Sequence, residues 1–368
     1  MEERKNICNF CGAVLDDDHT FVYDDTVMCE DCFDEHTLLC DCCGDRMWKD
    51  EAEGDTNITL CSYCYDNRYV YCDHCSRLIH RDDAYYFEDD DAPYCQTCYE
   101  RELHNRVIHD YSYKPEPIFY GEKMYLGVEL EVDEGGEDDD CANTLLDIAN
   151  KDNEHMYIKH DGSLDEGFEM VTHPMDLNYH INTMPWKDIL KKAVQMGYRS
   201  HQTNTCGLHV HINRTAFGET TEEQEEAIAR VVYFVEAHWN EMLKFSRRTE
   251  YSINRWAARY GLKDTPKGTY KDAKDKYMGR YVCVNLTNYN TIELRIFRGT
   301  LRYETLIAAL QMVSEICNTA VSLSDEEMQK MTWNDFVLDI SRENKELISY
   351  LKQRRLYVND AVPAEEEI

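Results

Sequence analysis

The stretch Gly127-Val-Glu-Leu-Glu-Val132 places two carboxylates at alternate positions of an apolar segment. At the two-residue period of a strand, Glu129 and Glu131 share one face, and the aliphatic side chains share the other. Three later segments repeat the pattern: 168–172 with Glu169, 207–213 with His209 and His211, and 291–297 with Glu293 and Arg295. We therefore predict four strands that carry ionisable groups on one face and aliphatic groups on the opposite face.

Any one of these segments alone is typical of a half-exposed strand. The set is different, because its polar positions hold carboxylates, imidazoles and a guanidinium instead of the Thr, Ser and Lys of an ordinary surface. Carboxylates two residues apart repel one another unless a cation lies between them. Oxygen ligands with one or two imidazoles suit Mg²⁺ or Mn²⁺ better than a structural zinc, and these ions commonly bridge to phosphates. The pattern favours a concave sheet that holds metal and nucleotide.

The segments between these strands predict helices, and hence an α+β fold. Thr220-Thr-Glu-Glu223 is a capping box, followed by apolar residues at helical spacing. Residues 304–323 and 334–355 are predicted as two further helices. Cys206, directly before the histidine strand, is interpreted as a buried structural thiol and not as a nucleophile. The acidic loop 134–140 is interpreted as a solvated connection.

The order of the motifs resembles that of a known family. An ExE strand, then DGS followed by an ExV(S/T) strand, then CGLHVHI, then IExRxF closely resembles the amidoligases, which are carboxylate-amine ligases sharing the fold of glutamine synthetase and glutamate-cysteine ligase. The resemblance covers roughly residues 122–320. It implies an ATP-dependent, amide bond-forming ligase that uses Mg²⁺ in an open, curved antiparallel sheet flanked by helices.

The resemblance also implies roles for individual residues. Glu129, Glu131 and Glu169 would be metal ligands, His209 and His211 would face the metal and the phosphates, and Glu293 would hold another metal ion. Arg295 would contact the phosphoryl group in transfer. Asp161, in His160-Asp-Gly-Ser163, matches an acidic residue on the substrate side and is our candidate for the base that removes the proton of the amine.

Four further residues are candidates for binding nucleotide or substrate. Arg247 and Arg248 match a basic segment that the family places near the nucleotide or the substrate. A basic helix end can equally complement the helix dipole. Arg280 and Asn285 lead into the last motif strand and are the remaining candidates.

The N-terminal part of the chain is a cysteine repeat. Pairs of the form CxxC begin at residues 8, 29, 40, 61, 72 and 95, and the unit recurs after 32 residues. Four thiolates in two such pairs match closed, tetrahedral zinc. A unit this short needs the metal to fold, so we predict three structural Zn²⁺ ions. The predicted ligands are Cys8, Cys11, Cys29 and Cys32; Cys40, Cys43, Cys61 and Cys64; and Cys72, Cys75, Cys95 and Cys98.

In each unit the first pair is predicted on a turn between short strands, and the second at the start of a short helix. The units resemble LIM-like and treble-clef zinc modules. Sequential and cross-brace ligation both remain open, and Cys42, His19 or His36 could replace a ligand. The predicted organisation is therefore modules at 8–32, 40–64 and 72–98 within residues 1–108, a linker at 109–121, a catalytic domain at 122–356 and an acidic tail at 357–368.

Composition narrows the function classes. With 72 acidic against 39 basic residues among 368, the net charge of −33 disfavours nucleic acid and anionic membrane surfaces as partners. Zinc modules with acidic loops favour a protein or peptide partner, and a small amine or amino acid is the other substrate class considered. No apolar run reaches the roughly 18 residues of a membrane span, and the first residues lack the apolar stretch of a secretory signal, so we expect a cytoplasmic protein with reduced cysteines.

The leading hypothesis is ATP-dependent ligation through an acyl phosphate, with the zinc modules recruiting a protein or peptide substrate. Two enzymatic alternatives keep the metals: a phosphotransferase acting on a guanidino group, and a metal-dependent amidase. The alternative from another class is a non-enzymatic adaptor, in which the zinc modules bind a partner.

Overall fold

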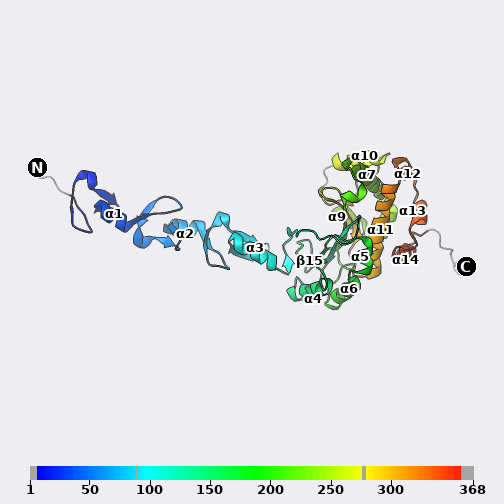
Figure 1. Ribbon diagram of the computed structural model, residues 1–368, viewed down its shortest axis with the longest axis horizontal. Coiled ribbons are helices and arrows are strands. Elements are labelled where there is room, and N and C mark those ends of the chain that lie inside the picture. The colour runs from blue at the N-terminus through cyan, green and yellow to red at the C-terminus, as the bar shows by residue number, and fades with distance from the viewer. Residues whose placement is uncertain (1–5, 88–89, 276–278, 358–368) are drawn as a thin grey trace. The chain divides into compact units, whose positions relative to one another are not determined.

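The computed structural model describes residues 6–87, 90–275 and 279–357. The expected tail, apart from Tyr357, lies outside these ranges. The chain divides into two compact units, Met1–Arg106 and Val107–Ile368 (Figure 1).

The first unit consists of three modules with a common design. As predicted, a hairpin carries the first CxxC pair in its turn, and the third cysteine is the N-cap of a short helix. A second hairpin, which was not predicted, lies between them. The strands are β1 (Asn6–Ile7), β2 (Val14–Leu15), β3 (Phe21–Tyr23), β4 (Thr26–Met28), β5 (Thr37–Leu39), β6 (Arg46–Trp48), β7 (Glu53–Gly54), β8 (Thr59–Leu60), β9 (Tyr69–Tyr71), β10 (Leu78–His80), β11 (Tyr85–Phe87) and β12 (Asp90–Tyr94). The helices are α1 (Glu30–His36), α2 (Ser62–Arg68) and α3 (Gln96–Asn105).

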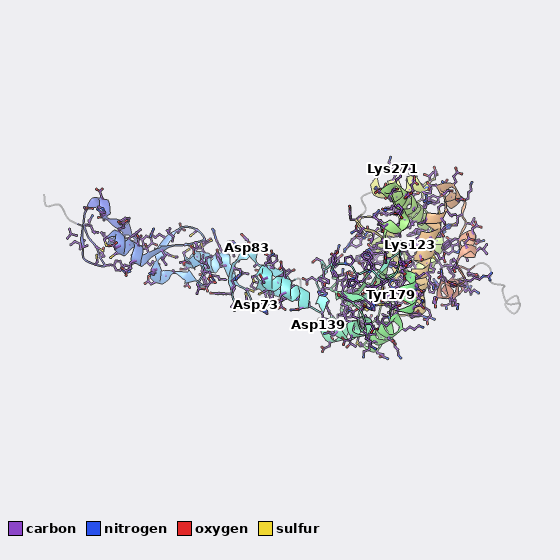
Figure 2. The ribbon with its side chains drawn as sticks, in the orientation of Figure 1. Asp73, Asp83, Lys123, Asp139, Tyr179 and Lys271 are labelled. Atoms are coloured by element: carbon purple, nitrogen blue, oxygen red, sulfur yellow. The ribbon has the colours of Figure 1, made fainter. Side chains whose placement is uncertain are left out.

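Each module buries very little besides its own cysteines. In the first, the buried apolar cluster is Cys8, Met28 and Cys32. Acidic side chains such as Asp73 and Asp83 of the third module are exposed (Figure 2). So small an apolar cluster gives little hydrophobic stabilisation. The stability of each module must therefore come largely from a link between its four thiols, such as a shared metal ion.

The second unit is built on a seven-stranded sheet. Its strands are β13 (Ile108–His109), β14 (Leu126–Val132), β15 (Met156–Lys159), β16 (Phe168–Thr172), β17 (Gly207–Asn213), β18 (Val284–Asn285) and β19 (Thr291–Arg298), in the order β13-β15-β16-β14-β17-β19-β18. Neighbouring strands are antiparallel except β13 and β15, which are parallel. The four predicted strands and the α+β class are confirmed, and the sheet is mixed instead of wholly antiparallel.

The expected linker is where the structure differs most from the prediction. The units divide between Arg106 and Val107, and β13 then pairs with β15 at the edge of the sheet. His109 stacks on Tyr113, with ring centroids 3.6 Å apart, and the amide of Tyr120 donates a hydrogen bond to the carbonyl of Pro174. Residues 109–121 therefore belong to the second unit.

Helices surround the sheet. They are α4 (Asp139–Ala149), α5 (Leu177–Asn182), α6 (Trp186–Gln195), α7 (Thr221–Ala237), α8 (Trp239–Ser246), α9 (Glu250–Trp256), α10 (Pro266–Asp275), α11 (Tyr303–Ser322), α12 (Asp325–Lys330), α13 (Trp333–Asp339) and α14 (Lys345–Gln353). Helices α4 and α6 pack together, and the long α11 contacts α5, α6, α7 and α14 (Figure 1). No helix in the described part of the chain is both long enough and apolar enough to cross a bilayer.

The helix predictions fare unevenly. The capping box at Thr220 forms as expected, with Glu223 as its reciprocal partner, and α11 coincides with the predicted 304–323 to within a residue. The single helix predicted at 334–355 is wrong, because α13 and α14 are separate. Between them the carboxylate of Glu315 on α11 accepts hydrogen bonds from the amide of Ser341 and from Nδ2 of Asn344, which holds the chain in a turn.

The aliphatic face of the sheet forms the core with the helices. Leu126, Val128 and Leu130 of β14 are fully buried, as are the alternate aliphatic residues of β17 and β19. Because this face is covered, the opposite positions of the same strands bring the ionisable side chains together on the other face.

Candidate functional site

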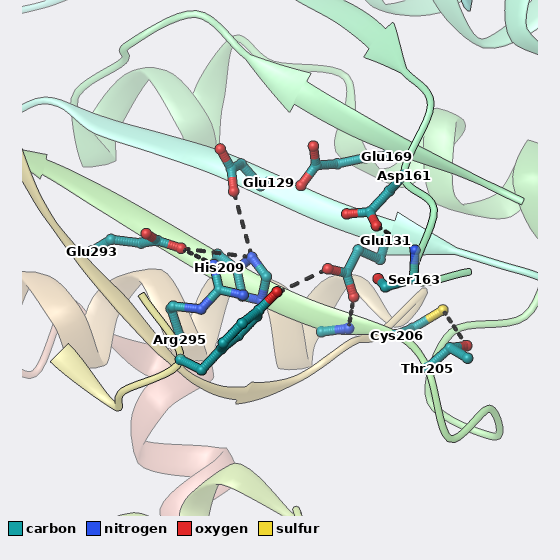
Figure 3. A network of polar contacts seen from close by, with 12 residues as sticks. Glu129, Glu131, Asp161, Ser163, Glu169, Thr205, Cys206, His209, Glu293 and Arg295 are labelled. Atoms are coloured by element: carbon teal, nitrogen blue, oxygen red, sulfur yellow. Dashed lines mark hydrogen bonds and ion pairs between the residues drawn. The ribbon is translucent and has the colours of Figure 1, made fainter. Parts of the chain in front are cut away.

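Strand register assembles the charged face from four neighbouring strands, β16, β14, β17 and β19. On β14, Glu129 lies opposite His209 of β17, and Glu131 lies opposite Glu169 of β16. On β17, His211 lies opposite Glu293 of β19. Directly opposed residues on one face have neighbouring side chains, so segments that are far apart in sequence converge on one cluster (Figure 3).

Glu129 is the centre of this cluster. One carboxylate oxygen lies 3.4 Å from Nδ1 of His209, and the other lies 3.1 Å from Nε2 of His211. Burial alone raises the pKa of Glu129, but the two imidazoles outweigh burial and hold that pKa well below its usual value. The same ion pairing raises the pKa of His211 against the effect of burial. Glu129 is therefore an anion that attracts positive charge from two sides.

Glu293 is held in a fixed orientation by its neighbours. Oε1 lies 2.5 Å from Nη1 of Arg295, and Oε2 accepts hydrogen bonds from Nδ2 of Asn285 and of Asn288, at 2.8 and 3.3 Å. Burial raises the pKa of Glu293, and His211 and Arg295 more than offset it, so the pKa is lowered. Asn285, one of the weaker candidates, thus positions Glu293.

Glu169 has a partner that the sequence analysis missed. Nζ of Lys159 lies 3.1 Å from its Oε2, and both side chains are buried. Burial and the charge of Glu129 hold the pKa of Glu169 well above its ordinary value, against the opposing effect of Lys159. The only sequence signal for this lysine is its place on the polar face of a short strand that leads into the DGS motif.

Glu131 is tied to the chain beside the histidine strand. Its Oε2 accepts a hydrogen bond from the amide of Gly207, and its Oε1 lies 3.8 Å from Nε2 of His209. A Cβ at Gly207 would lie 2.4 Å from Nη2 of Arg248 and 2.7 Å from the His209 ring. Glycine leaves the room that these two side chains occupy beside the backbone.

The charged face borders a cavity of about 60 Å³, within a larger space of about 520 Å³ that is partly open solvent. It is lined by Tyr111, Glu129, Glu131, Lys159, Asp161, Ser163, Glu169, Thr205, His209, Arg248, Trp256, Arg280, Tyr281 and Arg295. Eight predicted residues meet here. Glu293 does not line the cavity but contacts Arg295, which does, and His211 contacts Glu129, which also does; Asn285 contacts Glu293. Arg247 does not line it and faces a different cavity, together with His201 and Arg298. Tyr111, Thr205 and Tyr281 lie in loops, where isolated residues carry no periodicity, and Trp256 ends α9; none of the four was predicted. Ser163 belongs to the DGS motif but was not given a role.

The residues fit a metal ion bound by oxygen and imidazole ligands. Glu129, Glu169 and His209 each offer a ligand atom within 4.8 Å of the others, and so do Glu129, His211 and Glu293. The two groups share Glu129, as they would if its two oxygens served neighbouring cations. Carboxylate-rich sets of this kind suit Mg²⁺ or Mn²⁺.

In the first unit, the predicted cysteine clusters form in sequential order, from the two CxxC pairs of one module. In each of the three, four sulfur atoms lie within 4.8 Å of one another, close enough for one tetrahedral zinc. Backbone N–H groups, first that of Cys11, lower the pKa of Cys8 to about 6 despite burial. Cys42 is not part of its module's four-sulfur cluster. Its sulfur accepts a hydrogen bond from Nη1 of Arg68, at 3.7 Å.

Cys206 is buried, and it directly follows Thr205, which lines the cavity. Burial raises its pKa to about 12, and its sulfur contacts the hydroxyl of Thr205 at 3.8 Å. A thiol so hard to ionise is a poor nucleophile, in agreement with the structural role expected for it.

Comparison with known proteins adds a family similarity. Residues 147–317 match the family model described as "Putative amidoligase enzyme". The match contains Asp161, Glu169 and the motifs of β17 and β19, whereas Glu129 and Glu131 precede it. No curated protein matches the chain.

Among solved structures, the chain is similar to a bifunctional glutathione synthetase from Pasteurella multocida, at 11% identity and a TM-score of 0.37. The similarity covers 63% of this chain and 46% of that one, so the chain spans less than half the length of that protein. A likeness this distant carries no argument about function.

Proposed function

We propose that this protein is an ATP-dependent carboxylate-amine ligase with the glutamine synthetase-like fold, and that its reaction takes place in the carboxylate cavity. One observation carries the proposal. A single cavity combines Glu129, Glu131, Glu169 and His209 with three arginines, so sites for cations and for anionic groups lie side by side. The similarity of residues 147–317 to the amidoligase family model agrees with this assignment.

The carboxylates of the charged face would bind magnesium. Glu129, Glu169 and His209 would bind one ion, and Glu129, His211 and Glu293 a second, while Glu131 borders the first group from β14. Magnesium bound there would neutralise charge on the phosphates of ATP. Lys159 and Asn285 orient Glu169 and Glu293.

The cationic groups bind the transferring phosphoryl group and the substrate. A carboxylate is a poor acyl donor, because its leaving group would be oxide, so ATP first phosphorylates it and ADP departs. Arg295 stabilises the charge of the phosphoryl group during this transfer. Arg248 and Arg280 line the same cavity and orient the anionic ends of nucleotide and substrate.

The second half-reaction forms the amide bond. The amine attacks the acyl phosphate, the carbon–oxygen bond to phosphate breaks, and the amine loses a proton. Asp161 is the proposed base, since it borders the cavity and one of its oxygens is oriented by the amide of Ser163 at 2.8 Å. No protein residue becomes covalently attached.

The three cysteine modules are proposed to bind zinc and to recruit a protein or peptide substrate. Closed Zn(Cys)₄ centres have no open coordination position for chemistry, which leaves recognition as their contribution. Their exposed acidic residues favour a basic or neutral polypeptide over nucleic acid.

The test is a nucleotide assay on the full chain with magnesium, candidate carboxylates and a pool of amines. Ligation predicts ADP and inorganic phosphate in equal amounts, with a rate that depends on the added amine, and a product lighter by one water than its two substrates. ADP without phosphate release would indicate phosphoryl transfer to a stable acceptor. Hydrolysis of amides without ATP would indicate an amidase, and partner binding with no turnover would indicate an adaptor.

A further inference from the structure

The second unit has another cavity, of about 430 Å³ and wide open to solvent, which is lined mainly by cations. Its charged and titratable residues are His201, Lys244, Arg247, Arg248, Arg298 and Arg354, and we call it the basic cavity. No residue lining it, within the described part of the chain, is a carboxylate. Such a gathering is unexpected in a chain of net charge −33. The basic cavity shares only Arg248 with the carboxylate cavity.

Backbone carbonyls, and not acidic side chains, hold these cations in place. Nη2 of Arg298 donates to the carbonyl of Thr203 at 3.2 Å, and Nε and Nη2 of Arg354 donate to the carbonyl of Lys244 at 3.0 and 2.8 Å. Nζ of Lys244 donates to the carbonyl of Arg355 at 3.1 Å. These bonds orient the side chains without neutralising them, so the positive charge remains available to a ligand.

Arg248 is the buried member of the cluster. Its side chain belongs to a residue only 9% exposed, and its Nη1 has no hydrogen-bond partner among the described residues. Burial lowers its pKa to about 10, in spite of the charge of Glu131. A buried guanidinium nitrogen without an acceptor is costly, and a bound oxyanion in either of the two cavities that Arg248 lines would provide the acceptor.

The cations of the basic cavity also repel one another. Burial, together with Arg247, Arg298 and Arg354, lowers the pKa of His201, and burial with Arg247 lowers that of Arg298. Several mutually repelling cations around one space match a ligand of more than one negative charge. A phosphate ester carries between one and two charges near pH 7 and three acceptor oxygens, and it suits the forked geometry of arginine. A single carboxylate would neutralise only one of the cations around the basic cavity.

We propose that the basic cavity is a phosphate-binding site, distinct from the nucleotide site proposed above, which takes the phosphate group of a small phosphorylated ligand or free inorganic phosphate. This site does not depend on the proposed ligase function, because none of its residues apart from Arg248 borders the carboxylate cavity. It gives the second unit two anion sites on either side of Arg248.

The test is isothermal titration of the full chain, without added magnesium, with inorganic phosphate, pyrophosphate and phosphoserine as probes. We expect binding of at least one probe, and a loss of tenfold or more in affinity in the double variant Lys244→Gln, Arg354→Gln. The matched control Arg342→Gln removes an exposed arginine outside the cavity and should leave the affinity unchanged. Binding of phosphate and pyrophosphate but not phosphoserine would identify free phosphate as the source, and binding of all three would identify a phosphate ester.

Two further arms make the result decisive. Arg354→Lys keeps the charge but loses the paired donors to the carbonyl of Lys244 on α8. It should fold and bind the probes with intermediate affinity. This variant separates loss of the phosphate site from loss of that contact with α8. Citrate is the competing carboxylate. Equal affinity for citrate and pyrophosphate, or wild-type affinity in the double variant, would overturn the proposal.

The chain itself supplies a last rival for the basic cavity, because residues 358–368 carry Asp360 and three glutamates. A variant with these four carboxylates changed to amides should bind the probes no more than severalfold tighter than the natural chain. Binding that appears only in this variant would make the chain's own acidic segment the occupant and would refute an external ligand.

Discussion

Lys159 and Glu169 face each other across β15 and β16, with Nζ 3.1 Å from Oε2, and both side chains are buried. Burial lowers the pKa of Lys159, but Glu169 and Glu129 outweigh it, so that the pKa is raised and the lysine stays charged. Lys159 is the one lysine among the residues lining the carboxylate cavity. Its charge favours the ionised form of Glu169, which burial and Glu129 disfavour, and it balances part of the negative charge of Glu129.

The first prediction concerns this lysine. Lys159→Met leaves Glu169 buried without its partner, so we expect the free energy of unfolding to fall by about 3 kcal/mol and magnesium-dependent ATP affinity to change at least tenfold. Lys159→Arg is the matched control, because it keeps the charge, and it should retain most of the stability. Urea denaturation and nucleotide titration measure the two effects. Wild-type behaviour of Lys159→Met in both would show that the pair contributes nothing.

The second prediction concerns the cysteine clusters. Each of the three clusters should hold one zinc ion, so elemental analysis of the full chain should give three per molecule. Cys42→Ser should leave that count at three, since Cys42 lies outside its cluster, whereas Cys43→Ser should reduce it to two. Removal of zinc by a strong chelator should unfold the modules, seen as a loss of protection from proteolysis within residues 6–105. A reproducible content near one zinc would contradict three sites.

The third prediction concerns Glu131. Glu131→Gln keeps an oxygen that can accept the amide of Gly207, while it removes a negative charge facing Glu169. We therefore expect unchanged or slightly higher stability without metal, together with a loss of about tenfold or more in magnesium-dependent ATP affinity. Unfolding of this variant with intact nucleotide affinity would instead assign Glu131 a structural role.

The fourth prediction uses the boundary between the units. A chain that begins at Val107 keeps β13 and Tyr111, so it should retain nucleotide chemistry with small amines and lose only a macromolecular substrate. A chain that begins at Glu122 lacks the strand that pairs with β15 and the Tyr111 side chain, and it should lose most of that chemistry. Loss of all activity in the chain that begins at Val107 would contradict this prediction and would mean that the cysteine modules complete the active site.

Much of the site could be predicted because strand periodicity is a local property. The alternation in β14, β16, β17 and β19 places each ionisable residue on one face, and the aliphatic face fixes which side is buried. The cysteine repeat is equally local, since two CxxC turns at fixed spacing determine where four sulfur atoms converge. The sequence left ligation topology open, and the structure groups the cysteines of successive CxxC pairs, as sequential ligation would require.

What sequence reasoning missed depends on contacts between distant segments. The strand β13 has two residues and pairs with β15 some fifty positions later, so it has no periodicity to detect. The break between α13 and α14 depends on Glu315 in another helix. Arg247 and Arg248 are adjacent and equally basic in the sequence, and Arg247 has a left-handed backbone, with φ of 60°. Both side chains line the basic cavity, but only Arg248 also lines the carboxylate cavity.

The most direct test of the central claim follows an oxygen atom. The carboxylate substrate is first identified by amine-dependent release of ADP and is then labelled with ¹⁸O in its carboxyl group. The account predicts that one labelled oxygen appears in the inorganic phosphate for each amide formed. An isotope shift in the ³¹P spectrum detects it. Amide formation with no label in the phosphate would contradict activation of the carboxylate through an acyl phosphate.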